Sequence, residues 1–150
     1  MQVESFIEAS ARRHPGKVAL VCGGRRLTYG ELDRECNRVA HLLRSLGVQR
    51  GDRVAVYLDN SVEAVVAIFA ILKAGGVFLV VNPTVKPQKL AYILNNCRAA
   101  ALVADGRRRG GIREVWDETP HLRSVVAVGA PIEPSGVDRK QIAAFDADGP

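Results

Sequence analysis

The sequence predicts an α/β fold with a mainly parallel sheet and helices on both of its faces. Beyond residue 47, short apolar runs alternate with segments of helical periodicity, a pattern typical of β-α-β units with right-handed crossovers. Within residues 72–83, an apolar helix meets Gly75-Gly76 and gives way at once to an apolar run at 77–81. Glycine can end a helix in the left-handed conformation. An unbroken apolar run is typical of a strand buried on both faces.

The first part of the chain is predicted to hold a short helix and a β-hairpin. The helix covers residues 5–13, with Phe6 and Ile7 packed inward. Gly23-Gly24 separates two short extended runs, which is a hairpin pattern. A hairpin turn explains this glycine pair better than a phosphate-binding loop does. The predicted strands are residues 18–22 and 25–27.

The clearest single element is a helix over residues 29–46. Thr28 is a good N-cap and Glu31 follows three residues later, so the two predict a capping box. Apolar residues recur at helical spacing along one face, and Gly47 is expected to end the helix.

The rest of the sheet and its helices follow in alternation. Pro87 suits the first turn of one helix, and Pro120 is expected to stop another. The predicted order is strand 53–58, helix 61–74, strand 77–81, helix 86–96, strand 100–104, short helix 112–118 and strand 124–128.

The helix predicted at residues 61–74 is unusual because apolar residues occupy nearly all sides of the helix and surround Glu63. A helix of this kind is buried all round. One sheet face cannot cover it completely, so we expect another layer of protein over its far side. We expect that layer to be missing from this chain.

The composition after residue 129 changes. Pro131 and Pro134-Ser135-Gly136 are turn-forming residues, and the closing residues 146–150 have the same character. We therefore expect residues 131–150 to be a linker-like tail that stops in a turn.

The charge pattern argues against a nucleic-acid partner. The chain has 21 basic and 16 acidic residues, a net charge of +5, but only 5% aromatic residues with which to stack on bases. The basic residues are dispersed, apart from Arg107-Arg108-Arg109 between Gly106 and Gly110-Gly111. We expect that run to be a solvated, flexible loop, with contact to an anion or phosphate as the alternative.

The cysteines and the termini indicate a cytoplasmic protein. Cys22, Cys36 and Cys97 are widely spaced and form no C-x-x-C pair, so we expect three small buried thiols and neither a metal site nor a disulfide framework. No run of about 20 apolar residues occurs. The first residues also lack the pattern of a secretory signal. We therefore expect no transmembrane segment.

The search for catalytic motifs yields no site residue. No phosphate loop, dinucleotide-binding glycine fingerprint or nucleophile elbow occurs. Asp146 and Asp148 are interpreted as a solvated acidic end, because a hard metal needs several converging ligands. Lys73 lies in the last turn of a predicted helix, where a cation complements the helix dipole. We predict no catalytic, cofactor-binding or metal-binding residue in this chain.

Five segments resemble conserved segments of the adenylate-forming superfamily. Its members include AMP-forming acyl-CoA synthetases, aryl-CoA ligases, luciferases and nonribosomal peptide adenylation domains. The segments follow the family's order from about residue 6 to residue 128. They are L-T-Y-G-E-L at 27–32, G-V-Q-R-G-D-R-V-A-V at 47–56, N-S-V-E at 60–63, L-K-A-G-G-V-F-L-V-V-N-P at 72–83 and L-A-Y-I-L-N at 90–95.

The resemblance implies a two-step reaction in the complete enzyme. ATP and a carboxylic acid give an acyl-adenylate and pyrophosphate, and a thiol such as CoA then takes the acyl group. Mg²⁺ would assist by neutralising phosphate charge. Asn82-Pro83 is more similar to the acyl-CoA ligase branch. Peptide-synthetase adenylation domains usually carry Pro-x-Asp here, so a fragment of such a domain is the second candidate.

The chain departs from the family in what it lacks. The family's Ser/Thr/Gly-rich phosphate loop, its later ATP-site segments and its small C-terminal domain have no counterpart in residues 1–150. No catalytic or nucleotide-binding residue of the family is therefore assigned to a position of this chain, and we expect this chain to bind no cofactor. Residues 1–130 are expected to form the N-terminal part of the large adenylation domain. The acyl-selecting pocket would lie downstream.

Two functional readings follow. In the first, the chain is the N-terminal segment of an AMP-forming acyl-CoA ligase, truncated before the phosphate loop and partnered by the remainder of the adenylation domain. In the second, it is a free-standing interaction module that docks through the far side of helix 61–74. A dinucleotide-binding oxidoreductase shares only the fold class and lacks the glycine fingerprint.

Overall fold

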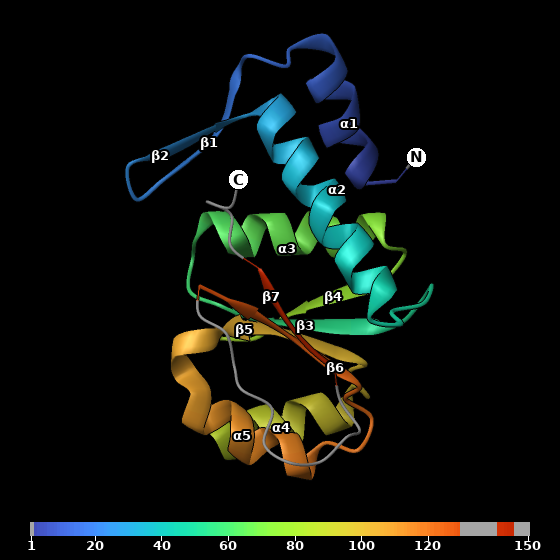
Figure 1. Cartoon of the computed structure of the whole chain (residues 1–150), viewed down its shortest axis with the longest axis vertical. Helices are drawn as coiled ribbons and strands as arrows, with labels where there is room; N and C mark the ends of the chain where they lie inside the picture. Colours follow the sequence, from blue (N-terminus) through green and yellow to red (C-terminus); the bar gives the residue numbers. More distant parts are fainter. Residues whose placement is uncertain (1, 130–140, 146–150) are drawn as a thin grey trace.

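The computed structural model describes residues 2–129 and 141–145 and has the predicted α/β fold (Figure 1). Its first part consists of a helix, a hairpin and a second helix, as expected. These elements are α1 (Glu4–Arg13), β1 (Val18–Cys22), β2 (Arg25–Thr28) and α2 (Tyr29–Ser45).

The capping box at the start of α2 is confirmed. Thr28 Oγ1 accepts a hydrogen bond from the Glu31 backbone N–H at 3.3 Å, and Glu31 Oε2 accepts one from the Thr28 backbone N–H at 2.8 Å. The latter bond is the main reason why the pKa of Glu31 lies below its usual value. Two N–H groups at the helix start are thereby satisfied. Gly47 follows the helix with φ 86°, as expected of a helix-ending glycine.

The hairpin is also confirmed, whereas one inward-facing residue of α1 was wrongly predicted. β1 and β2 pair antiparallel, and Gly23 and Gly24 both have positive φ, as a type I′ turn requires. In α1, Ile7 is buried but Phe6 is 59% exposed. Adjacent helical residues point about 100° apart, so only one of the two can face α2.

The second part is a five-stranded parallel sheet in the order β4-β3-β5-β6-β7. The crossover helices α3, α4 and α5 connect its strands. The elements are β3 (Arg53–Tyr57), α3 (Val62–Lys73), β4 (Val77–Val80), α4 (Pro87–Asn96), β5 (Ala101–Asp105), a 3₁₀ turn (Gly106–Arg108), α5 (Arg109–Glu118), β6 (Ser124–Val128) and β7 (Gln141–Phe145).

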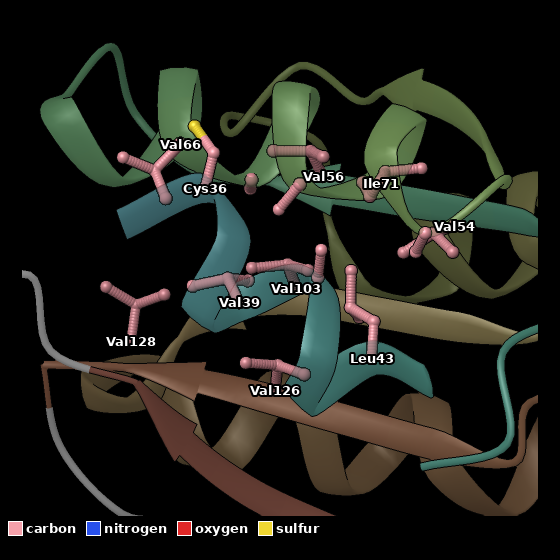
Figure 2. Packing of buried hydrophobic residues seen from close by; sticks show 14 of the residues in the cluster. Cys36, Val39, Leu43, Val54, Val56, Val66, Ile71, Val103, Val126 and Val128 are labelled. Carbon is pink, nitrogen blue, oxygen red and sulfur yellow. The ribbon is translucent and has the colours of Figure 1, made fainter. Parts of the chain in front are cut away.

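Helices cover both faces of the sheet, as predicted (Figure 1). α2 and α3 share one face and bury one apolar core against it, and α4 and α5 bury a second core against the other face. Figure 2 shows the first core, in which side chains from α2 and α3 meet those of β3, β5 and β6. Those labelled are Cys36, Val39, Leu43, Val54, Val56, Val66, Ile71, Val103, Val126 and Val128.

The expectation that α3 lacks its covering layer was wrong. α2 packs along α3, and α1 and β1 also contact it, so no residue of α3 is exposed. Five of its residues are buried, namely Val62, Val66, Ala67, Ala70 and Ile71. The layer that the apolar sequence demands is thus supplied by the first 45 residues of the same chain. The docking surface expected on the far side of this helix does not exist.

Two further expectations about the sheet were wrong. β4 is an edge strand, and Val77 and Val80 are 52% and 56% exposed, so an apolar run alone did not establish burial on both faces. Within the expected linker-like tail, Gln141–Phe145 forms β7 and pairs with β6. Residues 131–140 and 146–150 of that tail lie outside the described residues.

Gly75-Gly76 turns the chain from α3 into β4, as predicted. Gly75 has φ 88°, its N–H donates to Leu72 O at 2.9 Å, and the Gly76 N–H donates to Ile71 O at 2.9 Å. This pair of bonds is the Schellman arrangement that satisfies the last carbonyls of a helix. A Cβ on Gly76 would lie 3.1 Å from both Asp52 O and Ile71 Cγ2. The second glycine is therefore needed for the close approach of helix and sheet.

Two buried hydroxyls give opposite predictions for stability. Ser124 and Thr119 are each 1% exposed, but Ser124 Oγ has no hydrogen-bond partner among the described residues, whereas Thr119 Oγ1 donates to Val115 O at 2.8 Å. Removing an unpaired buried hydroxyl removes a desolvation cost. We expect Ser124→Ala to leave the free energy of unfolding unchanged or raise it, and Thr119→Val to lower it by about 1 kcal/mol. Urea unfolding followed by circular dichroism measures both, and a loss above about 1 kcal/mol in Ser124→Ala would contradict the assignment.

Candidate functional site

The candidate site lies where the order of strand addition reverses, at the carboxyl ends of the neighbouring strands β3 and β5. The chain leaves β3 through α3 on one face and leaves β5 through α5 on the other. In open α/β sheets, ligands bind at such a switch point. A cavity of about 250 Å³ lies beside it, on the side of α4 and α5. Its lining residues are Tyr57, Pro87, Leu90, Arg107, Arg108, Gly111 and Ile112.

Arg108 joins three segments at this cavity. Its Nη1 donates to Pro83 O in the loop after β4 and lies 3.4 Å from Tyr57 Oη at the end of β3. Its Nη2 lies 3.3 Å from Asp59 Oδ2, and its guanidinium carbon lies 5.3 Å from the centroid of the Tyr57 ring. The Tyr57 hydroxyl in turn donates to Val85 O at 2.7 Å. Arg108 thus fixes the 83–85 loop against β3.

Arg107 is held by the carboxylate that ends β5. Its Nε and Nη2 donate to Asp105 at 2.9 Å and 2.7 Å, and its backbone N–H donates to Asp105 Oδ1 at 2.9 Å. The side-chain bond from Arg107 is the main cause that holds the pKa of Asp105 below its usual range, and Asp105 likewise raises the pKa of Arg107. Both arginines at the cavity are therefore paired with carboxylates of the same chain.

The expectation of a flexible loop at Arg107-Arg108-Arg109 was wrong, although the Arg107 side chain is 80% exposed, as a solvated residue should be. Gly106–Arg108 forms a 3₁₀ turn that leads directly into α5. Asp105 accepts from the backbone two residues on, which organises the turn. Gly111 permits close packing, because a Cβ there would lie 3.1 Å from Pro87 Cγ. The side chain of Arg109 lies outside the described part. An aspartate closing an apolar strand two residues before an arginine was the signal available in the sequence.

The turn at Asp105 gives a pH-dependent prediction. The folded-state pKa of Asp105 is lowered from 3.8, so its stabilisation is present above that pH and is lost as the pH falls through the folded value. We expect Asp105→Asn to lower the free energy of unfolding at pH 7 by about 1 kcal/mol, and the difference from the native chain to shrink below about pH 4. Arg107→Met is the control and should lose less, because the backbone bond remains. A pH-independent difference would contradict the assignment.

Lys73 forms ion pairs with two carboxylates, in addition to lying at a helix end. Its side chain is 6% exposed, and Nζ donates to Glu8 Oε1 at 2.8 Å and to Asp33 Oδ1 at 2.9 Å. Burial disfavours the ammonium, but the two carboxylates outweigh it and raise the pKa of Lys73 above 10.5. The three residues tie α1, α2 and α3 together. The helix-dipole interpretation was incomplete, because the sequence gives no sign that positions 8, 33 and 73 converge.

The cysteines form no candidate site among the described residues. Cys36 is buried, and burial raises the pKa of its thiol to about 12, whereas Cys22 and Cys97 are only half-buried, contrary to expectation. Among the described residues, no group of three or more His, Cys, Asp and Glu could hold a metal ion. Asp146 and Asp148 lie outside the described residues.

The family of the chain follows from comparison with known proteins. The family model described as AMP-binding enzyme matches residues 7–146, nearly the whole chain. The chain belongs to the AMP-binding enzyme family.

The relatives of this family member include CoA ligases and bacitracin synthases. It is 38% identical over 128 residues to the medium/long-chain-fatty-acid–CoA/3-oxocholest-4-en-26-oate–CoA ligase of Mycobacterium tuberculosis, a match that covers 85% of this chain and 23% of the ligase. It is 37% identical over 127 residues to bacitracin synthase 3 of Bacillus licheniformis, covering 85% of this chain and 2% of the synthase. The chain thus spans about a quarter of the length of its ligase relatives.

Solved structures of CoA ligases share the fold of this chain. The anthranilate CoA ligase AuaEII, crystallised with anthranoyl-AMP, superposes with a TM-score of 0.81 at 29% identity, over 86% of this chain and 25% of the ligase. MbtA of Mycobacterium smegmatis superposes with a TM-score of 0.79 at 33% identity, over 87% of this chain and 25% of MbtA. These matches confirm the predicted family and fold.

The arginines and carboxylates around the cavity pair with one another in the described part of the chain. The two arginines at the cavity are engaged by Asp105 and Asp59, and no metal-binding group occurs in the described part of the chain. No reaction step is therefore assigned to these residues. No helix among the described residues is long and apolar enough to span a bilayer.

Proposed function

We propose that this chain supplies the N-terminal part of the large domain of an AMP-forming acyl-CoA ligase. The observation that supports this proposal most strongly is the family match over residues 7–146, in a chain that spans 23% of the length of its ligase relatives. The proposed reaction of the whole enzyme joins a carboxylic acid to AMP with release of pyrophosphate, and the acyl group then passes to the CoA thiol. ATP, Mg²⁺ and CoA are cofactors or substrates of that complete enzyme.

The role of this part is to build the sheet and fix its carboxyl edge. Arg108 holds the 83–85 loop against the end of β3, and Asp105 orders the turn into α5. These contacts give the switch point of the sheet a fixed shape before any ligand is present. Residues 1–130 are proposed as this structural part, with the rest of the adenylation domain as partner and the cytoplasm as location.

A second candidate is the same part of a peptide-synthetase adenylation domain. The 37% identity to bacitracin synthase 3 favours it. The two candidates differ in the thiol that accepts the acyl group, CoA in one and a carrier-protein thiol in the other. Asn82-Pro83 at the end of the β4 segment favours the CoA branch.

The isolated chain is expected neither to bind ATP nor to exchange pyrophosphate into ATP. The physical reason is that the cations at its cavity are already paired and that it presents no metal-binding group in its described part. Calorimetric titration of the chain with ATP and Mg²⁺ tests this. Micromolar ATP affinity would contradict the proposal that ATP is bound by the rest of the adenylation domain.

A further inference from the structure

We draw no further inference here: the strongest candidate, the exposed apolar edge of strand β4 (Val77–Val80), carries none, because nothing in the described structure shows what covers it and the proposed function already makes the rest of the adenylation domain its expected neighbour.

Discussion

Lys73→Met is expected to lower the free energy of unfolding by about 2–3 kcal/mol. The substitution leaves Glu8 and Asp33 facing each other without the cation that joins them. Removing one partner of a fully buried ion pair costs about 3–5 kcal/mol. The expected loss is smaller here because Glu8 is 40% exposed and Asp33 is 23% exposed, so water screens both carboxylates. Urea unfolding at pH 7 measures it.

The control for Lys73 is Arg38→Met, which breaks the surface pair with Glu35 and should cost at most about 1 kcal/mol. Adding Glu8→Gln and Asp33→Asn to Lys73→Met should restore part of the loss, because no unpaired charge remains. The pKa of Lys73 is raised in the folded state, so its contribution is full below pH 10.5 and fades as the pH rises through the folded value. A change below about 0.5 kcal/mol at pH 7 would show that the triad does not hold the helices.

Ile71→Ala is expected to lower the free energy of unfolding by about 3–4 kcal/mol. Ile71 is fully buried in the core between α2, α3 and the sheet (Figure 2). Deleting a buried isoleucine side chain loses its transfer energy and leaves a cavity, at a cost of about 2–5 kcal/mol. The same unfolding measurement applies.

Ile68→Ala is the matched control on the same helix. Ile68 is only half-buried, so its truncation should cost about half as much, roughly 1–2 kcal/mol. Equal losses at the two positions would mean that α2 does not cover α3 as described. Loss at Ile68 alone would contradict the whole packing arrangement.

The sequence predicted most elements because their signals are local. The Thr28–Glu31 capping box, the Gly23-Gly24 turn and the helix end at Gly75 each depend on residues a few positions apart. Burial was harder to predict, because it depends on where a strand lies in the sheet. The run at 77–81 reads as a central strand, yet it forms an edge, and the apolar α3 finds its cover in α2, a neighbour about 30 residues earlier.

The candidate site was predicted only in part. Family membership followed from ordered segments, but the site at the switch point depends on Tyr57, Pro83, Asp105 and Arg108, which converge from three segments. Arg107 and Arg108 read as a solvated run because glycines flank them. Their carboxylate partners, Asp105 and Asp59, became visible only through the fold. The convergence of Glu8, Asp33 and Lys73 was likewise beyond any local pattern.

The most direct test of the proposed role is a chimera with a relative. This chain would replace the 128-residue matching segment of the Mycobacterium tuberculosis ligase, and pyrophosphate exchange dependent on that ligase's fatty acid would be measured. We predict exchange by the chimera, and none by this chain alone or by the ligase lacking the segment. A folded chimera without exchange, or exchange by the chain alone, would contradict the account.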